Sequence, residues 1–124
     1  MERADKAVAL KHNGNNCCQA VLMAYEDELK VPAEQLRQLG AAFGAGMGCA
    51  EGTCGALCGA QMVLGLKTFD GKPIMKDAKA VLEQFRAKSG GTICKVLKGI
   101  ETGVVLSSCD DNVRHAVEVL EERA

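Results

Sequence analysis

The chain has 124 residues, which suits one domain, and its 48% apolar and 25% charged residues exclude a disordered protein. The formal net charge of −1 removes the electrostatic basis for binding nucleic acid or an anionic membrane. Three Phe and one Tyr are also too few for the aromatic platforms that bind single-stranded nucleic acid. We therefore expect no nucleic-acid partner and no membrane partner.

Apolar periodicity predicts an all-α fold of five to six helices, besides a short helical segment at 92–97. A glycine-rich connecting loop spans residues 40–52, and Gly90-Gly91 ends the predicted helix that precedes it. The first predicted helix begins near residue 4 and ends before residue 13, and the next three span about 17–30, 32–39 and 53–68. A fifth is marked by Ala78, Val81, Leu82 and Phe85, a short one covers 92–97, and the last is marked by Val113, Ala116, Val117 and Leu120. No stretch shows sustained β alternation or a repeat, so we expect one domain, residues 1–124, built as a compact antiparallel helical bundle.

The N-terminal residues and the longest apolar run both predict a cytoplasmic protein. Residues 1–5 carry charges of both signs and lack the apolar core of a signal peptide. The most apolar run, 55–66, is much shorter than the roughly 20 residues that span a bilayer. In a reducing compartment, seven cysteines favour metal or redox chemistry over structural disulfides. Cysteine also serves as a small buried hydrophobe, but that role suits one or two residues better than seven.

Four of the seven cysteines lie at or just inside a predicted helix start, beside residues that favour helix caps. They are Cys17 after Asn15-Asn16, Cys54 after Thr53, Cys94 two residues after Thr92, and Cys109 after Ser107-Ser108. A helix N-terminus has unpaired N–H groups and a partial positive charge, which stabilise a thiolate and lower the pKa of the thiol. Because the thiolate is the form that binds metals and exchanges electrons, these four are the candidate ligands.

The densest group of cysteines lies within residues 48–59. Cys54 and Cys58 are four residues apart and so share one helix face. Each is followed by a glycine, Gly55 and Gly59, which costs about 1 kcal/mol relative to alanine inside a helix. Such glycines are kept where a second backbone or a cofactor comes close. The pattern leaves open both a tight helix crossing and a cofactor site.

The cysteine spacing excludes several familiar sites. There is no Cys-x-x-Cys pair, which argues against a zinc ribbon and a thioredoxin-like site, and no Cys-x-x-Cys-His, which excludes covalent c-type haem. The ferredoxin spacings are also absent. Any ligands must therefore converge from separate helices.

The segments around the cysteines resemble a family of redox-active proteins named for its C/GCAxxG/C/C cysteines. The similar segments are Asn16 to Leu22 (NCCQAVL), Cys54-Gly55-Ala56-x-x-Gly59, Thr92 to Leu97, and Cys109 to Val117. The resemblance implies a helical fold and assigns the family's four characteristic cysteines to Cys17, Cys54, Cys94 and Cys109. A related domain in split-Soret cytochromes is associated with haem and an iron–sulfur centre, and only the non-haem part is implied for this chain.

We therefore expect an iron–sulfur cluster and no haem, with Cys17, Cys54, Cys94 and Cys109 as ligands. Additional candidate ligands are Cys18, Cys49 and Cys58. The expected role is electron transfer or redox sensing with a redox partner protein that the sequence does not identify. Two alternatives stay open: a thiol–disulfide or peroxide-reactive enzyme using paired cysteines, and a structural zinc domain with four Cys ligands. The oligomeric state is also open, a homodimer included.

In an oxidised sample, we expect disulfides to join different helices, with Cys54 bridging to Cys17, Cys94 or Cys109. Residues four apart on one helix, such as Cys54 and Cys58, have poorly aimed Cβ vectors for a disulfide.

Overall fold

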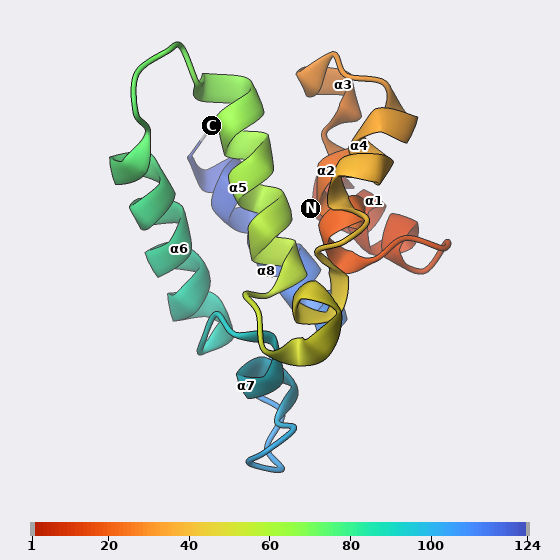
Figure 1. Ribbon diagram of the computed structural model, residues 1–124, viewed down its shortest axis with the longest axis vertical. Helices are drawn as coiled ribbons and strands as arrows, with labels where there is room; N and C mark the ends of the chain where they lie inside the picture. The colour runs from red at the N-terminus through yellow and green to blue at the C-terminus, as the bar shows by residue number, and fades with distance from the viewer. Residues whose placement is uncertain (1, 124) are drawn as a thin grey trace.

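The computed structural model describes residues 2–123, which fold into helices joined by turns and loops (Figure 1). The helices are α1 (Glu2–Lys11), α2 (Cys17–Ala24), α3 (Glu26–Leu29), α4 (Ala33–Gly40), the π-helical turn η1 (Gly46–Ala50), α5 (Gly55–Thr68), α6 (Met75–Ser89), α7 (Cys94–Lys98) and α8 (Cys109–Glu122). The described residues contain no strand, and their one β-type pairing is an isolated bridge. The all-α prediction is confirmed.

The described residues form more helices than the predicted five to six, for two local reasons. The second predicted helix divides at Tyr25, whose φ of −105° and ψ of 11° end α2 before α3 begins. The glycine-rich loop is also partly helical, because η1 forms within it around Met47 and Gly48, both at positive φ. In addition, α5 begins at Gly55 rather than at Thr53, since Thr53 belongs to the β-bridge.

Helix α5 is the centre of the fold (Figure 1). It packs against α2 and α6 on either side and against α8 behind, while α1 fills the angle between α2 and α8. The core consists mainly of Ala, Val and Leu, with Phe85 as its one fully buried Phe among the described residues. Small side chains such as Ala56 and Ala60 on α5 allow the neighbouring helices to approach closely.

A network of charges around Tyr25 joins α1, α3 and α8. The Tyr25 ring is buried beneath the Arg3 guanidinium, which lies 4.5 Å from the ring centre. Arg3 also forms ion pairs with Asp27 at 2.8 Å, Glu28 at 2.6 Å and Glu121 at 3.1 Å. This network lies at the α3 end of the molecule, whereas η1 and α7 lie at the other end (Figure 1).

None of the helices described between residues 2 and 123 combines the length and apolar character needed to cross a membrane.

Candidate thiol site

The four predicted site cysteines begin four different helices. Cys17, Cys94 and Cys109 are the first residues of α2, α7 and α8, and Cys54 is the N-cap residue of α5. The sequence therefore predicted their position at helix starts correctly.

Two of the predicted caps form and two do not. The Asn16 side chain accepts a hydrogen bond from the Gln19 N–H at 2.8 Å, and Ser108 accepts one from the Asp111 N–H at 3.1 Å. Neither α5 nor α7 has a side-chain cap bond, so the caps expected from Thr53 and Thr92 are wrong. Backbone pairing holds those two helix starts instead.

An isolated antiparallel β-bridge between Thr53 and Ile93 places two of the cysteines side by side. The Cys54 N–H donates to the Thr92 carbonyl oxygen at 2.7 Å, and the Cys94 N–H donates to the Gly52 carbonyl oxygen at 3.0 Å. Backbones paired in this way approach to about 4.5–5.5 Å between Cα atoms. The starts of α5 and α7 are therefore neighbours although they are far apart in the sequence.

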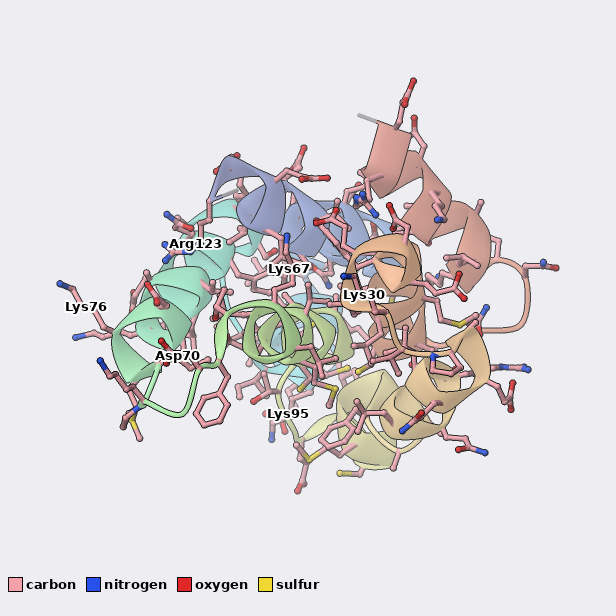
Figure 2. The ribbon with its side chains drawn as sticks, turned by 90° about the horizontal axis from the view of Figure 1, so that it is seen from above. Lys30, Lys67, Asp70, Lys76, Lys95 and Arg123 are labelled. Atoms are coloured by element: carbon pink, nitrogen blue, oxygen red, sulfur yellow. The ribbon has the colours of Figure 1, made fainter. Side chains whose placement is uncertain are left out.

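All four helix-start cysteines line one cavity of about 180 Å³, which we call the thiol cavity. Its lining residues are Lys11, Asn16, Cys17, Ala45, Cys54, Gly55, Cys94, Lys98, Cys109 and Asn112. Figure 2 shows sulfur atoms gathered beside α5 and the glycine-rich segment. The structure thus brings together the four cysteines that the sequence singled out.

Two glycines make room for the cysteine side chains of the thiol cavity. A Cβ atom on Gly55 would lie 2.5 Å from the Cys17 Sγ, and one on Gly46 would lie 2.5 Å from the Cys94 Cβ. Gly59 has a different role, because its Cβ would lie 2.9 Å from the Cys18 carbonyl oxygen, where α5 crosses α2. Gly55 therefore makes room for a site cysteine, as the cofactor-site interpretation expects, and Gly59 allows the tight crossing of α5 and α2, as the other interpretation expects.

Burial governs the thiol chemistry of Cys54 and Cys94. Burial raises the pKa of Cys54 to about 12, and neighbouring Cys17 and Cys94 raise it as well, although the backbone N–H groups of α5 oppose this. Burial likewise raises the pKa of Cys94, against the positive charge of Lys98. The expectation that helix starts lower the pKa is thus wrong for these two thiols, because desolvation outweighs the helix terminus.

The effect of each thiol on the pKa of its neighbours also indicates that the thiols lie close together. The charge of Cys17 raises the pKa of both Cys54 and Cys94, and the charge of Cys109 raises that of Cys94. Four thiolates in one small cavity repel one another, so the protein alone favours the protonated thiols. A bound metal reverses this preference, because coordination deprotonates the thiols.

Lys11, Lys98 and Asn112 line the thiol cavity and were not predicted from the sequence. Lys98 follows Cys94 by four residues on α7, and Asn112 follows Cys109 by three on α8, so each shares a helix face with a site cysteine. That spacing was the sequence signal available for both. Lys11 comes from α1 and had no such signal.

The other three candidate cysteines do not line the thiol cavity. Cys18 is fully buried, and its Sγ lies 3.9 Å from the Met62 Sδ. Cys58 is partly exposed in a separate region that we call the second groove, and Cys49 is exposed on η1. The residues of the second groove are Phe43, Thr53, Leu57, Cys58, Gln61, Met62 and Leu82. Burial raises the pKa of both Cys18 and Cys58.

The dimensions of the site bear on what it holds. All seven cysteines are free thiols, and between residues 2 and 123 no three Cys, His, Asp or Glu side chains are close enough to hold one metal ion. A tetrahedral zinc ion requires sulfur atoms about 2.3 Å from the metal. By contrast, a cavity of about 180 Å³ far exceeds the roughly 10–15 Å³ that one water requires.

The family model described as "Putative redox-active protein (C_GCAxxG_C_C)" matches residues 15–123 of the chain. The matched residues include all four cysteines of the thiol cavity and every helix from α2 to α8. Comparisons with curated proteins and with solved structures give no match.

Proposed function

The chain belongs to the redox-active C_GCAxxG_C_C family, and from this premise we propose that its thiol cavity binds an iron–sulfur cluster for electron transfer or redox sensing. One observation carries the proposal: Cys17, Cys54, Cys94 and Cys109, from four separate helix starts, line a single cavity. Cysteine thiolates are the usual protein ligands of such clusters.

The residues present fit a cluster in three respects. The donor set is entirely soft thiol sulfur, which selects iron–sulfur clusters, zinc or copper(I) over hard cations. Gly46 and Gly55 leave space that any Cβ atom would fill. The buried Asn112 side chain lines the cavity, and its Nδ2 makes one long bond of 3.5 Å to the Ser107 carbonyl oxygen, which leaves an N–H able to donate to a sulfur atom. When bound, a cluster supplies an electron-transfer couple.

The chain's own residues would perform the remaining tasks. The four cysteines would release their protons on binding, including the proton that burial holds firmly on Cys54. Lys11 and Lys98 would offset the negative charge of the thiolates from the cavity wall. Cys54 and Cys94 are buried whereas Cys17 and Cys109 are partly exposed, so the bound group would be partly shielded from solvent.

The two alternatives receive less support from the geometry. A thiol–disulfide or peroxide-reactive enzyme needs an accessible thiolate of low pKa, whereas Cys54 is buried and its pKa is raised. A structural zinc site needs a tighter cluster of ligands than residues 2–123 contain. The proposal also includes a cytoplasmic setting, where thiols stay reduced, and an electron partner whose identity is open.

Metal and sulfide analysis of protein produced without oxygen tests the proposal. We expect iron and acid-labile sulfide together with visible charge-transfer absorption, all of them lost in Cys54→Ser and kept in Cys58→Ser. A colourless protein that contains zinc would favour the structural zinc site. A protein that stays colourless and free of iron after anaerobic reconstitution would contradict the cluster.

A further inference from the structure

Four polar side chains besides the cysteines line the thiol cavity, and two of them form bonds that hold the surrounding helices. The Asn16 amide caps α2 and donates to the carbonyl oxygens of Gly40 at 3.2 Å and Ala41 at 3.3 Å. Lys11 pairs with Asp110 at 2.8 Å. Both residues therefore have a structural role that accounts for their position.

Asn112 has hydrogen-bonding capacity that the protein does not use. It is only 3% exposed, its Oδ1 has no partner, and its Nδ2 donates one long bond of 3.5 Å to the Ser107 carbonyl oxygen. An amide nitrogen carries two N–H donors, so one of them is free. A buried N–H without a partner costs about 1–3 kcal/mol, so the free amide N–H of Asn112 beside four thiols calls for an explanation.

Lys98 is the second group with unused capacity. Among residues 2–123, no carboxylate pairs with it, whereas Lys95 on the same short helix pairs with Glu101 at 3.1 Å. Lys98 lines the cavity together with Cys94, which lies one helical turn before it on α7. Lys95 does not line the cavity. The two lysines of α7 thus form a matched pair, one beside the thiols and one outside.

Resting on the iron–sulfur proposal, we infer that Lys98 and Asn112 set the reduction potential of the bound cluster. Reduction adds one electron and hence one negative charge to a group already surrounded by thiolates. The Lys98 ammonium stabilises that added charge through space, and the free Asn112 N–H stabilises it by donating to a cluster or cysteine sulfur. Both groups favour the reduced state and so raise the potential.

Potentiometric titration of the loaded protein tests Lys98. We expect Lys98→Met to shift the potential to more negative values, and the matched control Lys95→Met to shift it much less. Raising the salt concentration should reduce the difference only slightly, since Lys98 is partly buried. Equal shifts in the two variants would overturn the inference for Lys98.

For Asn112, the variants Asn112→Leu and Asn112→Asp separate tuning from packing. We expect both to lower the potential, the aspartate more strongly because it places a negative charge beside the cluster. The control is Gln61→Leu in the second groove, which also removes an unpartnered buried amide oxygen and should leave the potential unchanged. If both Asn112 variants keep the parent potential, the role assigned to Asn112 is wrong.

Iron and sulfide content is measured first, because it separates a failure of the proposed cluster from a failure of the tuning role of Lys98 and Asn112. If the parent protein binds no cluster, the proposed function fails and the tuning role fails with it. If the parent and the variants load equally but share one potential, the function stands and the tuning role alone fails. Should Asn112→Leu not fold, Asn112→Asp and Lys98→Met still decide the matter.

Discussion

The thiol cavity and the second groove contain cysteines that are close neighbours in the sequence, yet their surroundings differ. On α2, Cys17 lines the cavity and the next residue, Cys18, is enclosed in the core. On α5, Cys54 lines the cavity and Cys58, one helical turn further along, lies in the groove. Besides the four cysteines, two lysines line the cavity, together with Asn112, whose side-chain amide uses only part of its hydrogen-bonding capacity. The groove surrounds its thiol with Phe, Leu and Met side chains and with Thr53 and Gln61, but none of these lining residues is charged.

This difference shows how a shift of one residue or one turn changes the role of a cysteine. At the helix starts, backbone ends and polar side chains surround the sulfur, which suits a charged ligand. One residue further along α2, the hydrophobic core encloses Cys18, which acts as a small hydrophobe. The predictions below test whether the two regions differ in function as they differ in structure.

The largest expected effect is on metal content. Cys54→Ser removes a ligand from the thiol cavity, and we expect bound iron to fall by more than the 10–100-fold typical of losing an outer-shell group. Cys58→Ser changes the same atom one turn further along α5 and should keep the parent iron content. Both are measured by iron and sulfide analysis after anaerobic purification. Equal losses in the two variants would mean that the second groove shares the site.

The second prediction concerns thiol reactivity in metal-free protein. With the pKa of Cys54 raised to about 12, its thiolate fraction at pH 8 is about 10³-fold below that of an ordinary thiol of pKa about 8.5. We expect alkylation of Cys54 to be slower than that of partly exposed Cys58, and to rise tenfold per pH unit well beyond pH 9. Mass mapping of alkylated peptides measures both rates. A Cys54 rate that levels off near pH 9 would show that burial does not control it.

The same shift in pKa predicts how the stability of the metal-free protein depends on pH. Since the folded pKa of Cys54 is raised, the folded state holds this proton more tightly than the unfolded chain. The resulting stability is present below about pH 8.5 and is lost progressively as the pH rises toward 12. Urea unfolding of the parent and of Cys54→Ser at several alkaline pH values measures this. The variant should lose less stability over that range.

Two glycine substitutions on α5 should differ by a smaller amount in their effect on stability. Gly55→Ala would place a Cβ 2.5 Å from the Cys17 Sγ and 2.8 Å from the Phe43 carbonyl oxygen, so we expect a loss of about 1–3 kcal/mol in unfolding free energy and a drop in iron content. Gly65→Ala, on the same helix, meets nothing within 4 Å and should stabilise the protein by up to about 1 kcal/mol. Chemical denaturation checks both. Unchanged stability and iron content in Gly55→Ala would show that the site does not depend on Gly55.

The smallest expected effect belongs to the helix cap beside Cys17. Asn16→Ala removes the capping bond to the Gln19 N–H and should cost about 0.5–2 kcal/mol of stability, with a modest loss of iron affinity. Met62→Leu in the second groove is a near volume-conserving change that should cost less than about 1.5 kcal/mol and leave iron affinity intact. Denaturation and competition with an iron chelator measure both. Unchanged affinity in Asn16→Ala would show that the position of Cys17 does not depend on the cap.

The sequence predicted the helix-start cysteines because their signal is local. Asn16 and Ser108 are cap residues next to Cys17 and Cys109, and their side chains form the expected bonds. The division of the second helix at Tyr25 was not predicted, because tertiary contacts with Arg3 and α8 hold that residue. The direction of the Cys54 pKa was likewise missed, since burial depends on how the helices pack.

The groups that complete the thiol cavity required the three-dimensional fold. Spacing in the sequence links Lys98 to Cys94 and Asn112 to Cys109, but only the packing of α7 and α8 brings both side chains to the same cavity. The meeting of Cys54 with Cys94 depends on a single β-bridge, which is too short to leave an alternating pattern in the sequence.

The bridge between Thr53 and Ile93 has a consequence for how such a site evolves or is redesigned. Its hydrogen bonds use only main-chain groups of Gly52, Cys54, Thr92 and Cys94, so they survive an exchange of the side chain at Cys54 or Cys94, proline excepted. Gly52 is the fixed member, because a Cβ there would lie 2.9 Å from the Gly46 carbonyl oxygen. The separation of the two ligand positions is therefore inherited independently of the ligands themselves. A lineage can exchange cysteine for histidine, serine or aspartate at either position and explore new chemistry without dismantling the frame that holds it.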